Sequence, residues 1–176
     1  MATLGKSEME SALLRLGELA ATEGEHVELL LLGGGAMVLR FDARSATRDV
    51  DAVILAPPDR AAVRRWAAVV AEERGWSPDW LNEGAKSYLV AAGVGETLIS
   101  AAGLTVRLPT IEQLLAMKLC AWRDDLDVSD AKRLLIELAG DHDAVWSRVE
   151  THLQPGRELK AKYAFEDLWE SLHDTA

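Results

Sequence analysis

A short apolar segment that ends in consecutive glycines is the feature that most constrains the fold. Residues 27–32 are apolar except for Glu28, and three glycines, residues 33–35, follow directly. A run this short, apolar and bounded by glycine is typical of a buried strand. The next four residues, 36–39, are apolar and predict a short helix. We therefore expect a sheet in which one buried strand leads through glycines into a helix.

The remaining patterns predict strands in the first part of the chain and helices in the second. Ser7-x-x-Glu10 and Thr110-x-x-Gln113 each have the form of a capping box, so helices are expected over 8–22 and from 110 through 120. The other expected elements are a strand at 49–55, a helix opened by Pro57-Pro58-Asp59 and ending at Arg74, a hairpin of 96–100 and 104–108 with a three-residue loop, and helices near 127–139, 144–153 and 157–173.

These elements predict an α/β (α+β) fold with a small mixed sheet, flanking helices and a C-terminal helical bundle. The 176 residues suit a single domain. Within it we expect a sheet-containing core at 1–109 and a helical part at 110–176.

Composition limits the classes of partner. Lys and Arg total 19 against 29 for Asp and Glu, which gives a formal charge of −10. A protein that coats DNA or RNA needs a basic surface, so that class is excluded. The longest apolar run is too short to span a membrane, and the first ten residues lack the apolar segment of a signal peptide. A single cysteine, Cys120, allows no internal disulfide, so we expect a cytoplasmic protein.

Two carboxylates, Asp49 and Asp51, open the strand expected at 49–55. Side chains two apart on a strand share a face and lie roughly 7 Å apart along it. Such a pair can converge on Mg²⁺, which prefers hard oxygen ligands. The cation would bridge nucleotide phosphates and orient the attacking and leaving oxygens.

Residues around the two carboxylates suit a phosphate. Gly33 and Gly34 let the backbone approach a triphosphate, and the helix that they open points free amides at the anion. Arg44, Thr47 and Arg48 can add charge and hydroxyl contacts. The alternatives are a solvated carboxylate pair or a structural ion pair with Arg48, because two like charges at the start of a buried strand repel unless a cation compensates them.

The order of these motifs resembles that of the polymerase-β-type minimal nucleotidyltransferases, and in particular the AbiEii-like toxins and an uncharacterised AbiEii-related branch. Leu32-Gly33-Gly34 and Arg44-x-x-Thr47-x-Asp49-x-Asp51 form the first motif block. Lys118-x-x-Ala121-x-Arg123 followed by Asp127-x-x-Asp130 forms the second. Trp80-Leu81-Asn82 followed by Lys86 is similar to the same branch.

The resemblance implies a nucleotidyltransferase-type sheet and a role for each motif residue. Asp49 and Asp51 would hold Mg²⁺, or Mn²⁺, and Gly33 and Gly34 would seat the triphosphate of an NTP. Lys118 would contact phosphate or stabilise leaving-group charge. Asp130, or else Asp127, would orient or deprotonate the acceptor, or complete the acidic site.

The chain departs from the larger superfamily at one point. Many members carry a third carboxylate on a later strand, and here Glu96 is the only acid of the expected hairpin. Either the third acid comes from Asp127 or Asp130, or the metal site is weakened.

Two functions follow as hypotheses. The first is an Mg²⁺-dependent nucleotidyltransferase that moves an NMP to a tRNA 3′ end or a protein hydroxyl, as the toxin of a toxin–antitoxin pair. The second is a weakly active or inactive nucleotide-binding or interaction module on the same fold. Arg40, Arg44, Arg48 and Lys118 are expected around the same site. Such a basic rim would allow a short RNA end to dock on an acidic protein.

Overall fold

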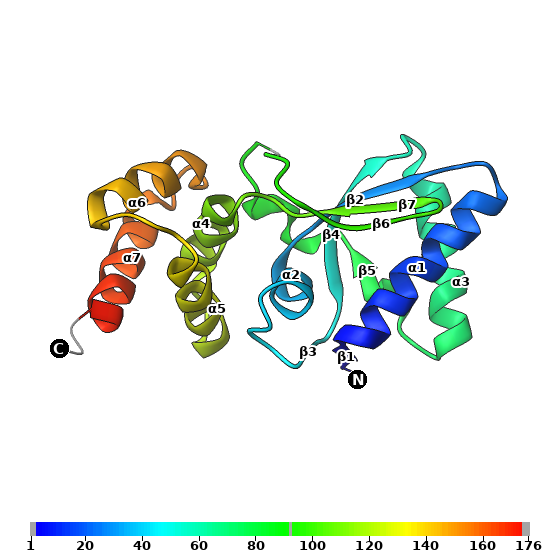
Figure 1. Ribbon diagram of the computed structural model, residues 1–176, viewed down its shortest axis with the longest axis horizontal. Helices are drawn as coiled ribbons and strands as arrows, with labels where there is room; N and C mark the ends of the chain where they lie inside the picture. The colour runs from blue at the N-terminus through cyan, green and yellow to red at the C-terminus, as the bar shows by residue number, and fades with distance from the viewer. Residues whose placement is uncertain (1–2, 92, 174–176) are drawn as a thin grey trace. The chain divides into compact units, whose positions relative to one another are not determined.

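The computed structural model describes residues 3–91 and 93–173 and has a mixed α/β fold, which confirms the expected fold class (Figure 1). The chain divides into two compact units. Unit 1 comprises Met1–Lys86 and Val94–Pro109, and unit 2 comprises Ser87–Gly93 and Thr110–Ala176. The sequence predicts a boundary between the sheet-containing and helical parts after residue 109. In the structure, residues 87–93 also belong to the helical unit.

Unit 1 is built on a mixed sheet with the strand order β5-β4-β2-β7-β6. Its strands are β2 (Val27–Leu31), β4 (Val50–Ala56), β5 (Leu81–Asn82), β6 (Thr97–Ala101) and β7 (Leu104–Arg107). The apolar run at 27–31 forms the central strand, antiparallel to β4 and parallel to β7. β5 is parallel to β4 at one edge. A second, two-stranded sheet pairs β1 (Leu4–Gly5) with β3 (Ala46–Thr47).

Three helices accompany the sheet of unit 1: α1 (Lys6–Thr22), α2 (Gly33–Leu39) and α3 (Arg60–Arg74). α1 packs against α3 and β7, and α2 packs against β4 (Figure 1). Two 3₁₀ segments flank β5, namely η1 (Pro78–Trp80) and η2 (Gly84–Tyr88). The sheet edge at β5 is therefore followed at once by a tight turn.

Three local expectations in unit 1 are wrong in detail. α1 begins at Lys6, and the reciprocal bond at its start runs from Gly5 N to Glu8 Oε2 (2.9 Å), so Ser7 does not cap it. Pro57 and Pro58 precede α3, whose cap is Asp59. The hairpin loop has two residues because Ala101 pairs with Leu104.

Unit 2 is helical, with α4 (Ile111–Ala121), α5 (Asp125–Ile136), α6 (His142–Val149), a 3₁₀ turn η3 (Glu150–His152) and α7 (Glu158–His173). α4 packs against α5, α6 and α7, and all its residues from Gln113 through Ala121 are buried. The Thr110 capping box is confirmed: Gln113 N donates to Thr110 Oγ1 (3.3 Å) and Thr110 N donates to Gln113 Oε1 (3.2 Å).

The other helices of unit 2 differ from expectation at their ends. α5 begins at Asp125 with Asp124 as its cap, and α6 begins at His142. Asp127 therefore lies inside the first turn of α5. In the part of the chain that is described, no helix has the length and apolar character needed to cross a bilayer.

Candidate functional site

Gly33 lies against the carboxylate of Asp51 in unit 1. Its φ of 55° is in the left-handed region, which favours glycine. A Cβ at this position would meet Asp51 Oδ2 at 2.9 Å. Leu32 N also donates to the backbone oxygen of Asp51 at 2.7 Å. The sharp entry into α2 therefore needs glycine both for its backbone angle and for its clearance from Asp51.

Gly34 lies equally close to two other predicted site residues. A Cβ on it would be 2.4 Å from Thr47 Oγ1 and 3.3 Å from Arg44 Nη1. Thr47 is buried on β3, and Arg44 is half-buried in the preceding loop. The structure thus brings Gly33, Gly34, Arg44, Thr47 and Asp51 together within unit 1.

Arg48 differs from its neighbours. Its side chain is exposed, and within residues 3–91 and 93–173 it makes no ion pair with Asp49 or Asp51. The Arg48–carboxylate pair that we considered as a structural alternative is therefore not formed.

The two carboxylates contact the last residue of β5 and the turn that follows it. Asn82 Nδ2 donates to Asp49 Oδ2 at 3.0 Å, and Ala85 N donates to Asp51 Oδ1 at 3.1 Å. The parallel register that pairs Asp51 with Asn82 produces this arrangement. The sequence alone assigns no role to Asn82, because its contact with Asp49 depends on how β5 pairs with β4.

The residues of this cluster fit a hard divalent cation and a phosphate. Asp49 and Asp51 offer carboxylate oxygens, and the absence of a Cβ at Gly33 and Gly34 lets the backbone lie directly against Asp51 and Thr47. Among the described residues, no three His, Cys, Asp or Glu side chains come together as a metal group. Glu96 forms an ion pair with Arg40, one of the four cations expected around the site.

A separate cavity of about 380 Å³ lies beside β4 and β5. Ala52 and Ile54 line it, together with Val63 and Ala67 of α3. Because side chains alternate along a strand, Ala52 and Ile54 face the side of β4 opposite to Asp51. Asn82 and Glu83 also line the cavity, so it adjoins the turn that contacts the two carboxylates.

The second motif block forms a buried ion cluster in unit 2. Lys118 Nζ lies 3.2 Å from Asp127 Oδ1 and 2.6 Å from Asp130 Oδ2. Arg123 Nε lies 3.0 Å from Asp127 Oδ2. The side chains of Asp127 and Asp130 are each 1% exposed, against 65% for Arg123. Lys118 is thus neither an exposed helix lysine nor part of an open basic rim, because two carboxylates surround it.

The charges around Asp127 set its protonation. Burial by itself would raise the pKa of Asp127, but the hydrogen bonds from Arg123 and the charge of Lys118 outweigh it and lower the pKa to about 2. The carboxylate is therefore ionised at neutral pH and is held by cations of its own unit.

The predicted site residues thus form two groups, one in each unit. Gly33, Gly34, Arg44, Thr47, Asp49 and Asp51 belong to unit 1, and Lys118, Asp127 and Asp130 belong to unit 2. The roles given to the second group stay a prediction from the resemblance. Comparisons with protein-family models, curated proteins and solved structures return no match.

Proposed function

We propose that this protein is an Mg²⁺-dependent nucleotidyltransferase that moves an NMP from an NTP to an acceptor hydroxyl. One observation carries the proposal: Gly33 and Gly34 lie against Asp51 and Thr47, so that a carboxylate, a hydroxyl and closely approaching backbone meet in unit 1. The order of these motifs in the sequence supports the same function.

Each group in unit 1 has a distinct part in this proposal. Asp49 and Asp51 would hold Mg²⁺ (or Mn²⁺), which when bound neutralises phosphate charge and orients the reacting oxygens. Gly33 and Gly34 would let the backbone approach the triphosphate. Arg44 would supply charge and Thr47 a hydroxyl to its oxygens.

The reaction is an in-line displacement at the α-phosphorus. The acceptor hydroxyl oxygen forms the new bond to that phosphorus, and the bond from it to the α–β bridging oxygen breaks. Pyrophosphate leaves with the bonding electrons, and the hydroxyl proton passes to a base or to solvent. We propose a tRNA 3′ end or a protein hydroxyl as acceptor, in a cytoplasmic toxin–antitoxin pair with a cognate antitoxin.

Incubation with each α-³²P-labelled NTP, Mg²⁺, tRNA and protein acceptors tests the proposal. We expect label transfer by the wild type and at least a 100-fold loss in Asp49→Asn and Asp51→Asn. Asp42→Asn is the matched control, because Asp42 is an exposed acid of the same loop that pairs with Lys6. Absence of both transfer and metal-dependent NTP binding in the wild type would refute the proposal.

A second candidate is a nucleotide-binding module without turnover. It is favoured by the pairing of Glu96 with Arg40, since this removes the only acid of the hairpin as a third carboxylate. Calorimetry that showed Mg·NTP binding, together with no label transfer to any acceptor, would support it over the enzyme.

A further inference from the structure

We propose that Asn82 is the positioning residue for Asp49, and that the turn of residues 82–86 fixes both carboxylates of the site. This inference rests on the proposed nucleotidyltransferase function. Asn82 touches neither substrate nor reacting atoms in the proposal, and it acts through Asp49.

The Asn82 side chain is held at both ends of its amide. Its Nδ2 donates to Asp49 Oδ2 at 3.0 Å and to the backbone oxygen of Asp79 at 3.3 Å. Its Oδ1 accepts from Gly84 N at 2.7 Å. The amide has therefore one orientation in which all three bonds are satisfied, and that orientation aims a donor at Asp49.

The same turn reaches the second carboxylate through its backbone. Ala85 N donates to Asp51 Oδ1 at 3.1 Å. A Cβ on Gly84 would lie 2.8 Å from Asn82 Oδ1 and 3.3 Å from Asp51 Oδ1. Gly84 therefore lets the turn pass close enough for one short segment to contact Asp49 and Asp51 together.

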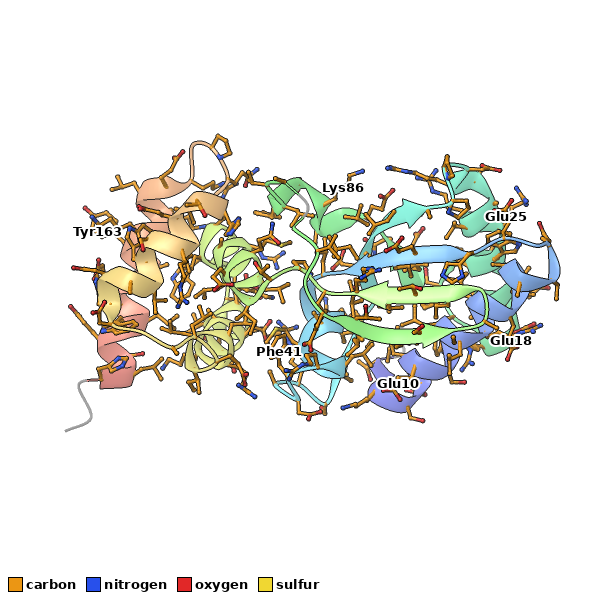
Figure 2. The ribbon with its side chains drawn as sticks, turned by 45° about the horizontal axis from the view of Figure 1, so that its top comes forward. Glu10, Glu18, Glu25, Phe41, Lys86 and Tyr163 are labelled. Atoms are coloured by element: carbon orange, nitrogen blue, oxygen red, sulfur yellow. The ribbon has the colours of Figure 1, made fainter. Side chains whose placement is uncertain are left out.

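The far side of the turn is anchored by Glu83. Its carboxylate, 18% exposed, lies 3.4 Å from Arg60 Nη1 and 3.7 Å from Arg64 Nη2 of α3. Lys86, on η2 (Figure 2), is 3.5 Å away. The turn is thus bound to helix α3 through Glu83, and to the two carboxylates through Asn82 and Ala85.

The chemistry of the donor matters for a metal ligand. An amide N–H fixes the orientation of Asp49 without neutralising it, so the carboxylate keeps its charge for a cation. Loss of such a supporting bond typically lowers metal affinity or activity 10- to 100-fold. The substitution Asn82→Asp would remove the donor and add a like charge beside Asp49.

The experiment measures Mn²⁺ binding by electron paramagnetic resonance, with a non-hydrolysable α,β-methylene NTP present, alongside transfer rates. We expect Asn82→Ala to weaken Mn²⁺ affinity 10- to 100-fold and Asn82→Asp to weaken it further, with transfer by Asn82→Ala recovering at high Mn²⁺. Ser77→Ala, which removes the cap of η1 next to the turn, is the control and should bind Mn²⁺ like the wild type.

The outcomes separate the two proposals. If the wild type binds Mn²⁺ and transfers label but Asn82→Ala matches it in affinity, the inference about Asn82 is wrong and the proposed function stands. If Asn82→Ala only lowers the melting temperature and keeps wild-type Mn²⁺ affinity, its role is structural, which also overturns the inference. If the wild type neither binds nor transfers, both proposals fail.

Discussion

At the scale of single residues, the acids of the two motif blocks have different partners. Asp49 accepts from the neutral amide of Asn82, whereas Asp127 accepts from Lys118 and Arg123. A carboxylate held by a neutral donor keeps its charge for a cation, and one held by cations is already compensated. The contacts of Asp49 therefore support the proposed metal site, whereas the charge of Asp127 is compensated within its own unit.

The lowered pKa of Asp127 predicts a specific dependence of stability on pH. Because the folded pKa is about 2, below the ordinary 3.8, the ionised form is favoured by folding. Its contribution, roughly 2 kcal/mol at 1.36 kcal/mol per pKa unit, is complete above pH of about 4 and is lost as the pH falls towards 2. Urea unfolding of wild type and Asp127→Asn should give stabilities that converge over this interval.

Asp125→Asn is the matched control, because Asp125 is exposed in the same first turn of α5. Its stability should follow the wild type in parallel from pH 7 to 2. A gap between wild type and Asp127→Asn that stayed constant over the same range would contradict the prediction.

At the scale of elements, long patterned segments could be predicted and very short ones could not. The apolar run at 27–31 and the Thr110 capping box each carry their signal within one segment, and both formed as expected. β3 and β5 have two residues each, too few to show any periodicity. They exist only because β1 and β4 lie beside them.

The same reasoning explains what was missed at the site. Gly33, Asp49 and Asp51 could be recognised because each lies at the end of a strand that the sequence itself predicts. Asn82 could not be assigned a role, since its contact with Asp49 depends on the β4–β5 register. Thr47 meets Gly34 while Arg48 is exposed, because successive side chains of an extended segment point in opposite directions.

The packing of α1 on the hairpin predicts the effect of a single methyl group. Alanine is favoured over glycine inside a helix by about 1 kcal/mol. At Gly17, however, a Cβ would lie 2.6 Å from Leu104 Cβ and 3.0 Å from the Ala102 oxygen, neither of which can rotate away. We expect Gly17→Ala to lower the free energy of unfolding by about 1–3 kcal/mol, as overpacking does.

Denaturant unfolding measures this change, and Gly24→Ala is the comparison. Gly24 has φ 75° with nothing within 4 Å of its Cβ position, so it reports backbone strain without a clash. The double variant Gly17→Ala/Leu104→Ala leaves the Cβ contact in place and should not recover stability. A Gly17→Ala protein more stable than the wild type would show that helix preference outweighs the clash.

At the scale of the whole molecule, the net charge of −10 repels the phosphates of nucleic acids. Attraction is then restricted to places where cations are not compensated by nearby acids. Arg40 pairs with Glu96, and Lys118 is enclosed by Asp127 and Asp130. Arg40 and Lys118, both expected in the basic rim, therefore already have acidic partners. Any RNA acceptor must then be bound locally, through few phosphates.

This charge distribution predicts how the protein responds to a long polyanion. When binding neutralises Z phosphates, the logarithm of the binding constant falls with the logarithm of the salt concentration at a slope of about −0.9Z. A protein without a basic surface therefore gains little affinity for DNA even at low salt. Fluorescence anisotropy of a labelled random-sequence DNA duplex measures this binding. We expect no binding at micromolar protein concentration between about 50 and 200 mM KCl. A variant with Glu83→Gln, which leaves Arg60, Arg64 and Lys86 without their shared carboxylate, is the positive comparison and should bind more tightly at the lowest salt. Micromolar binding of the duplex by the wild type, with a slope of several units, would mean that exposed cations outweigh the net negative charge.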